Sequence, residues 1–255
     1  MKITIWNVNG IRAGFRNQAD QWWQQYQPDV LCLQEIRARP DQLSRSQLEK
    51  LADWSAVWHP AQRAGYSGVA CFCRQSPLST KKGLGKARFD REGRVIELIY
   101  PHFHIFNLYV PNGQRDLKRL DYKLDFYQTL LDRCHQLHED GENIILGGDF
   151  NTAHRPIDLR NPKENQGHTG FLPEERAWID RFLESGFQDA FRELYPRRES
   201  YTWWTYRYNA RRRDIGWRLD YFLVSRGLME RISDVIIHTE VEGSDHCPVT
   251  LIIEP

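Results

Sequence analysis

The chain has 255 residues, and its 35 lysines and arginines against 34 aspartates and glutamates leave a formal net charge of only +1. This balance excludes a strong field over the whole molecule, so any nucleic-acid site has to be a local feature. The 40% hydrophobic content is enough to build a core, and no run of about 18 apolar residues indicates a membrane span.

In chain order, the hydrophobic pattern predicts many short strands and a few long helices. Strands are expected at Lys2–Asn7, Asp29–Glu35, Ser67–Cys73, Val95–Tyr100, His102–Val110, Asn143–Asp149, Tyr201–Tyr206, Arg218–Val224, Asp234–His238 and Val249–Ile253. Apolar residues at steps of three and four predict a helix from about Asp116 to His138. Pro173 followed by two glutamates predicts the start of another helix.

These elements indicate an α/β (α+β) protein, a four-layered sandwich of two packed β-sheets flanked by helices. We expect one domain over residues 1–255, although length alone also fits two small domains. The order of the strands cannot be read from the sequence.

The five cysteines, an odd number without a C-x-x-C pair, mostly lie in apolar runs such as Val30–Leu33 and Val69–Phe72. We interpret them as reduced, buried residues of a cytoplasmic protein, which argues against a zinc site. Lys2–Asn7 leads directly into a strand pattern, so no signal peptide is expected.

Acids, amides, a tyrosine and a histidine recur where apolar strands end. The clearest cases are Asn7 and Asn9, Gln34-Glu35, Tyr109 with Asn112, Asp149 with Asn151, Asp220, and Asp245-His246. Each has a plain alternative, such as a turn for Asp149-Phe150-Asn151 or a core position for Tyr109. Their joint occurrence indicates a functional site at loop edges on a rigid scaffold.

Eight segments of the chain, most of them at these strand ends, together resemble motifs of the exonuclease III and abasic-site endonuclease family, within the endonuclease/exonuclease/phosphatase superfamily. They run in the family's order from residue 6 to residue 248, essentially the whole chain. The motifs are Trp6-Asn7-Val8-Asn9-Gly10, Leu33-Gln34-Glu35, Gly65-Tyr66-Ser67-Gly68-Val69-Ala70, Phe89-Asp90-Arg91-Glu92-Gly93-Arg94, Tyr109-Val110-Pro111-Asn112, Gly148-Asp149-Phe150-Asn151, Gly216-Trp217-Arg218-Leu219-Asp220-Tyr221 and Ser244-Asp245-His246-Cys247-Pro248.

The resemblance implies metal-dependent phosphodiester hydrolysis. Glu35 and Asp245, with Asn9 nearby, match the family's metal positions, and Asp149 and Asn151 match residues that activate and orient the water. Mg²⁺ is the expected ion, since it binds few protein oxygens and keeps several waters, and Mn²⁺ is expected to substitute.

The resemblance also assigns a catalytic histidine and its partner. His246 matches that histidine and Asp220 its carboxylate, which would fix the imidazole and stabilise its cation. Either Asp149 or the His246–Asp220 pair then serves as the general base. Tyr109, Asn7 and Asn112 match positions that contact the scissile phosphate.

Rings and arginines interleave between residues 201 and 217, a pattern that suits nucleic acid because arginine binds phosphate and rings pack on sugars and bases. A core strand beside a solvated basic turn is the alternative. By resemblance, Trp203 and Trp217 form the pocket for an abasic sugar turned out of the helix. Arg115 matches a position that inserts into the duplex, or is a solvated residue before a helix.

Two departures from the family pattern stand out. His168 occupies a position that is usually Asn, at the border of the pocket, where its ring could narrow the space for an abasic sugar. Arg37 stands where Lys is common after Gln-Glu, which keeps the charge but changes its geometry.

The main hypothesis is a monomeric DNA-repair hydrolase acting on double-stranded DNA with abasic sites or damaged 3′ ends, as an abasic endonuclease, 3′→5′ exonuclease and 3′-phosphatase. An alternative is mainly a 3′-phosphatase or exonuclease in which His168 restricts abasic incision. Two further readings, a catalytically silent DNA-binding module and an inositol or lipid phosphatase, fit less well. The complete acidic set argues against the first, and the absence of membrane-binding features against the second.

Overall fold

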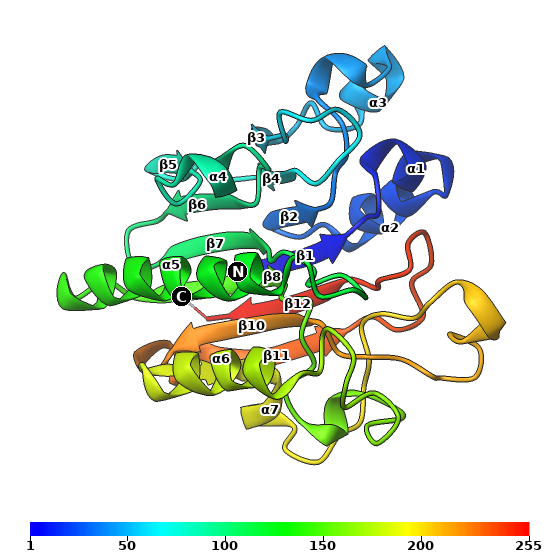
Figure 1. Ribbon diagram of the computed structural model, residues 1–255. Coiled ribbons are helices and arrows are strands. Elements are labelled where there is room, and N and C mark those ends of the chain that lie inside the picture. Colours follow the sequence, from blue (N-terminus) through cyan, green and yellow to red (C-terminus); the bar gives the residue numbers. More distant parts are fainter. Residues whose placement is uncertain (255) are drawn as a thin grey trace.

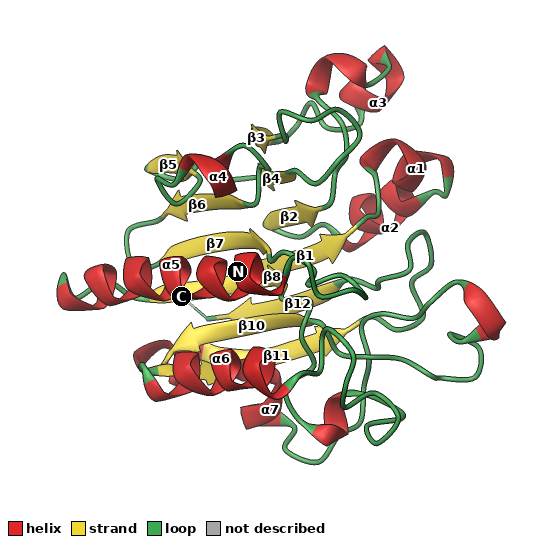
Figure 2. Ribbon diagram, in the orientation of Figure 1, coloured by secondary structure: helices red, strands yellow, loops and turns green. Residues whose placement is uncertain are grey.

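The computed structural model describes residues 1–254, which form two six-stranded sheets that pack face to face (Figures 1 and 2). The first sheet has the order β11-β12-β1-β2-β4-β3 and the second β5-β6-β7-β8-β10-β9. Only β1–β2 and β7–β8 pair in parallel among the paired strands; the other pairs are antiparallel. This architecture confirms the predicted layered sandwich.

The strands of the first sheet are β1 (Lys2–Asn7), β2 (Val30–Gln34), β3 (Ser55–His59), β4 (Val69–Cys73), β11 (Ile232–Ile237) and β12 (Val249–Ile253). Those of the second are β5 (Ser79–Lys82), β6 (Val95–Ile99), β7 (His104–Tyr109), β8 (Ile144–Asp149), β9 (Phe187–Asp189) and β10 (Asp220–Ser225). The helices are α1 (Ile11–Arg16), α2 (Ala19–Tyr26), α3 (Arg45–Glu49), α4 (Ala87–Asp90), α5 (Leu120–Glu139), α6 (Pro173–Glu184) and α7 (Ala190–Leu194).

Alternation along the strands divides the side chains between a central and an outer core. On β7, Ile105 belongs to the core between the sheets, whereas Phe106 faces the layer formed by α5 and α6. Trp23 of α2 packs in the same way against Trp6 and Leu31 on the outer face of the first sheet. Figure 1 shows α5 and α6 along the second sheet and α1 and α2 beside the first.

The long helix begins at Leu120, so the predicted start at Asp116 is wrong. Gln114 and Leu117 have positive φ angles of 64° and 57°, which a continuous right-handed helix cannot contain. The predicted helix start at Pro173 is confirmed. No helix among residues 1–254 is long and apolar enough to cross a membrane.

The predicted strand at Tyr201–Tyr206 is also wrong. Only Trp203 takes part in pairing there, through isolated bridges to Trp217 and His246. The hydroxyl of the neighbouring Thr202 instead accepts hydrogen bonds from the backbone amides of Leu219 and Asp220. This irregular backbone places an aromatic side chain next to the end of β10. All five cysteines are buried and free, as predicted.

Candidate active site

A cleft of about 550 Å³ opens where β1, β2, β7 and β8 end and β10 begins. Twelve of the predicted site residues line it: Asn7, Glu35, Tyr109, Asn112, Arg115, Asp149, Asn151, His168, Trp203, Trp217, Asp245 and His246. Asn9 and Asp220 do not line the cleft but contact residues that do. The fold therefore brings the whole predicted set together from segments that span the chain.

Asp149, at the end of β8, is held by several hydrogen bonds. It accepts hydrogen bonds from the Asn7 side chain (2.9 Å) and from the Asn151 backbone amide (2.8 Å). Asn7 also donates to Glu35 (3.2 Å), so one amide links two carboxylates. Asn151 in turn accepts a hydrogen bond from Asn112 (3.0 Å). This network fixes the direction of the Asp149 carboxylate.

His246 lies between two buried carboxylates. Its Nδ1 is 2.8 Å from Asp220 Oδ2, and its Nε2 is 3.8 Å from Asp149 Oδ2. Burial disfavours the imidazolium, but the charges of Asp220 and then Asp149 outweigh it and raise the pKa of His246 to about 10. Burial and the charge of Asp220 raise the pKa of Asp149, while His246 opposes this shift. At neutral pH the histidine is therefore a cation beside a buried carboxyl.

A second group of oxygens, from Glu35 and Asp245, lines the same cleft. Asp245 accepts hydrogen bonds from Asn9 Nδ2 (2.9 Å) and Trp203 Nε1 (3.1 Å), and Glu35 pairs with the guanidinium of Arg37. The pKa of Tyr109 is raised by burial and by the nearby charge of Glu35, so its phenol stays protonated. Carboxylate and amide oxygens of this kind suit a hard divalent cation.

The aromatic wall consists of Trp203 and Trp217, whose rings meet edge to face with centroids 6.4 Å apart. Their backbones exchange two hydrogen bonds of 2.9 Å, and Phe171 packs edge to face against Trp217. His168 and Arg115 line the same cleft. The predicted pocket residues thus lie beside the acidic group.

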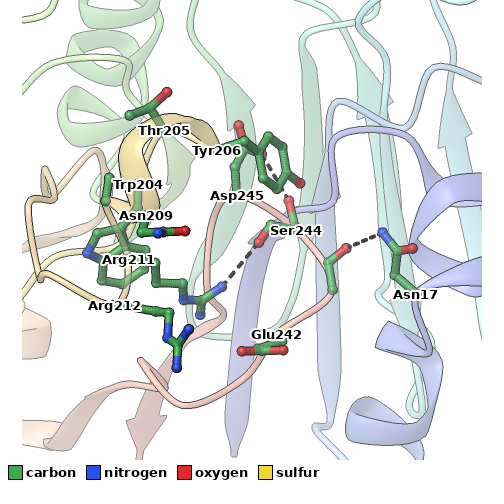
Figure 3. A pocket seen from close by; sticks show the side chains of 12 residues that line it. Asn17, Trp204, Thr205, Tyr206, Asn209, Arg211, Arg212, Glu242, Ser244 and Asp245 are labelled. Carbon is green, nitrogen blue, oxygen red and sulfur yellow. Dashed lines mark hydrogen bonds between the residues drawn. The ribbon is translucent and has the colours of Figure 1, made fainter.

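A second hollow of about 400 Å³ adjoins the cleft and shares Thr205 and Asp245 with it (Figure 3). Here Arg211 donates to the carbonyls of Ser244 (3.2 Å) and Thr239 (3.0 Å), and its guanidinium lies 4.7 Å from the Trp204 ring. The donors of Arg211 therefore hold the loop that carries Asp245. Arg212 lines the hollow and Arg213 is exposed.

Sequence reasoning assigned no role to Arg94, which the structure places behind the cleft. Its buried guanidinium donates to the Tyr109 carbonyl (2.9 Å) and the Tyr66 hydroxyl (3.0 Å), and it lies 4.8 Å from the Tyr109 ring. Arg94 therefore orients Tyr109 from behind. The signal was its place in the Phe89–Arg94 motif, although a motif alone does not show whether a residue contacts the substrate or supports one that does.

Comparison with known proteins agrees with this geometry. Residues 5–246 match the model of the endonuclease/exonuclease/phosphatase family. The chain is 44% identical to an exodeoxyribonuclease of Bacillus subtilis (strain 168), with 99% of both chains covered. Similar solved structures include an AP endonuclease from Archaeoglobus fulgidus (29% identity, TM-score 0.89, with 100% of both chains covered). Another is the Neisseria 3′ phosphatase NExo bound to a product DNA hairpin (30% identity, TM-score 0.91, 100% of this chain and 99% of that one).

The chain belongs to the endonuclease/exonuclease/phosphatase family. Within that family, its relatives are DNA-repair hydrolases of the exodeoxyribonuclease III and AP endonuclease type.

Proposed function

We propose that this protein is a metal-dependent DNA-repair phosphodiesterase that cleaves the backbone 5′ to abasic sites and removes 3′ blocking groups or nucleotides. The observation that carries the proposal is one cleft that holds the Asp149–His246 pair, the Glu35–Asp245 oxygens and the Trp203–Trp217 wall. Its substrate is double-stranded DNA with abasic sites or damaged 3′ ends. A monomer in the cytoplasm, without a membrane partner, is part of the same proposal.

In this proposal Asp149 activates the attacking water and Asn151 orients it. His246 is the alternative base, but the charges around it keep its pKa at about 10, so it holds its proton at neutral pH. As a cation, His246 donates hydrogen bonds to the phosphate, and Asp220 fixes its ring through Nδ1. The raised pKa of Asp149 suits a base that has to accept a proton near neutral pH.

Tyr109, Asn7 and Asn112 are proposed to position the phosphate with neutral donors. The raised pKa of Tyr109 keeps its hydroxyl protonated and able to donate. Arg115, exposed at the rim of the cleft, is proposed to contact the duplex. Fixed donors aimed at a transferring phosphoryl group supply most of the protein's contribution to such reactions.

The residues present fit a divalent cation. Glu35 and Asp245 supply carboxylates, Asn9, whose Nδ2 bonds Asp245, supplies an amide, and Asp149 and Asn151 complete the oxygen set. The ligand atoms of Asp149, Asp220 and His246 also lie within 4.8 Å of one another. We assign that group to proton handling, because His246 Nδ1 is hydrogen-bonded to Asp220. Mg²⁺, with Mn²⁺ as substitute, would neutralise charge on the phosphate.

A second candidate is mainly a 3′-phosphatase or exonuclease whose abasic endonuclease activity His168 restricts. The observation that favours it is the place of His168 in the lining of the cleft, together with Thr169 and Gly170, on the side of Trp217. A ring there reduces the room for an abasic sugar, whereas removal of a terminal 3′ phosphate needs less space.

Two duplex substrates distinguish these candidates. One carries a single stable abasic analogue and the other a 3′ phosphate, each assayed with Mg²⁺ and with chelator. We expect metal-dependent cleavage immediately 5′ to the analogue as well as 3′-phosphate removal. Phosphate removal without incision would support the second candidate, and no cleavage of either substrate would overturn both.

A further inference from the structure

Lys123 and Glu175 form an ion pair in which both side chains are completely buried, with 2.6 Å between Nζ and Oε1. Lys123 lies in the first turn of α5 and Glu175 in the first turn of α6. Desolvation makes such pairs poor stabilisers, and apolar residues of similar volume often replace them without loss of stability. Stability alone therefore does not explain the pair, and the other hydrogen bonds of the two side chains have to be considered.

Lys123 holds the backbone that follows β8. Besides Glu175, its ammonium donates to the Asn151 carbonyl and to the Thr152 hydroxyl, both at 2.7 Å, so all three protons have acceptors. Asn151 has a positive φ of 50°, and its side chain bonds Val110, Asp149 and Asn112. The lysine thus fixes the peptide of a proposed catalytic residue without reaching the cleft itself.

Glu175 holds the other side of the cleft. Its carboxylate accepts the amides of Gly170 (2.5 Å) and Leu172 (3.1 Å) and the hydroxyl of Thr169 (3.1 Å). Gly170 packs so closely that an added Cβ would lie 3.2 Å from both the Trp217 ring and the Asn151 carbonyl. His168 directly precedes this clamped segment, so Glu175 determines where that wall of the cleft lies.

We propose that the Lys123–Glu175 pair is a positioning device that fixes the distance between the His168–Gly170 wall and the Asn151 backbone. This inference rests on the proposed function, because that distance separates the nucleotide pocket from the hydrolytic residues. Neither side chain touches substrate; each acts through the residues it holds. Loss of the pair lets the wall and the catalytic backbone move independently, which misplaces the water and the phosphate relative to each other.

The first variant is Glu175→Gln, which keeps the shape and removes the charge. Glu97→Gln is its control. Glu97 is also buried, and it pairs with Arg133, which lies on α5 like Lys123. Arg133 lies ten residues beyond Lys123, about 15 Å along the helix. We expect kcat for DNA cleavage to fall at least tenfold in Glu175→Gln with KM changed less than threefold, and both constants to stay near wild type in Glu97→Gln.

Amide hydrogen exchange provides a readout that does not depend on cleavage. The amides of Gly170 and Ala153, which bond Glu175 and the Gly170 carbonyl respectively, are expected to exchange at least tenfold faster in Glu175→Gln. If the wild-type protein cuts no DNA but these amides still exchange faster in Glu175→Gln, the positioning role of the pair stands and the proposed function is overturned. Unchanged exchange in Glu175→Gln would overturn the clamp.

The double variant Lys123→Met with Glu175→Leu separates positioning from stability. An apolar pair of similar volume is expected to restore the unfolding midpoint to that of wild type, but not the hydrogen bonds to Asn151 and Gly170. We expect a folded protein whose kcat stays at least tenfold low. If the double variant is as active as wild type, the pair is only structural and the proposal is wrong.

Discussion

At the scale of single residues, the proposed chemistry of the cleft depends on whether Asp149 or His246 carries the proton. Asp220 Oδ2 bonds His246, while Asp220 Oδ1 is buried without a hydrogen-bond partner among the described residues. The charge of Asp220 is the largest contribution that favours the charged form of His246. Among the neighbouring residues, Asp220 therefore has the largest influence on whether His246 is charged.

The variant Asp220→Asn tests this control. Without the carboxylate, the largest contribution that raises the pKa of His246 is lost, so this pKa is expected to fall clearly below its wild-type value of about 10. The turnover rate is expected to fall on the order of 10²-fold or more, as when a histidine loses its orienting carboxylate. NMR titration of the His246 ring, assigned with His246→Gln, measures the pKa; a ring that still titrates near 10 would contradict this account.

In the second candidate function, the choice of substrate depends on His168. Replacement by Asn shortens the side chain at the wall of the cleft, so abasic incision is expected to rise about tenfold relative to 3′-phosphate removal. The exposed His102, replaced in the same way, is the control. The ratio of kcat/KM values on the two duplexes is the measurement, and an unchanged ratio would mean that the ring does not limit the pocket.

At the scale of elements, strands place the catalytic groups and their ends were easier to predict than the loops between them. Strands β1 and β12 have the predicted bounds, and β2, β7 and β8 lie within a few residues of theirs because their apolar runs are buried on both faces. The Tyr201–Tyr206 segment misled the prediction. Tyr201 and Trp204 pack in the central core and Trp203 lines the cleft, but the backbone forms only isolated bridges.

Gly147 and Gly148 in β8 show how closely elements approach beneath the site. A Cβ at Gly148, where φ is 147°, would lie 2.0 Å from the Leu108 carbonyl oxygen, and one at Gly147 would lie 2.8 Å from Phe222. These glycines allow β8 to pass between its neighbours and deliver Asp149 at its end. The sequence analysis placed both glycines inside the predicted strand Asn143–Asp149 but gave no sign of these close approaches.

The variant Gly148→Ala is expected to lower the free energy of unfolding by about 3 kcal/mol, because backbone atoms cannot yield to the added methyl group. Gly141→Ala is the control: φ there is also positive at 81°, but nothing lies within 4 Å of the added Cβ. Its cost is expected to stay near 1 kcal/mol. Urea unfolding compares the two, and equal losses would show that the close approach is unimportant.

At the scale of the whole molecule, buried charges join segments that the sequence separates widely. Arg218 bonds Asp158 (2.8 Å) and Asp189 (2.7 Å), and Arg192 bonds Asp158 (2.6 Å), which connects the lead into β10 with β9 and α7. Sequence patterns predicted the layers and the site because these follow local periodicity and motifs. They could not predict this network or the Lys123–Glu175 pair, whose partners are defined only by the fold.

The network predicts how stability depends on pH. Burial alone would raise the pKa of Asp158, but Arg218 and Arg192 outweigh it and lower the pKa. The unfolded chain, with a pKa near 3.9, then binds the proton more readily, so the stabilisation is present above about pH 4 and is lost as pH falls through the folded pKa.

Asp158→Asn is therefore expected to lower the unfolding free energy by about 3 kcal/mol at pH 7 and by progressively less below pH 4. Urea titrations at several pH values measure this, with exposed Asp41→Asn as control. A loss that is the same at pH 3 and pH 7 would contradict the assignment of a charged Asp158.

Asp149 is proposed to activate water in this cleft, and single-turnover cleavage of the abasic-analogue duplex by Asp149→Asn tests this role most directly. The duplex Kd, measured in parallel, separates chemistry from binding, and exposed Asp53→Asn serves as control. We expect cleavage at least about 10³-fold slower than wild type with binding changed less than threefold. Cleavage within tenfold of wild type would contradict it and return the role of base to the His246–Asp220 pair.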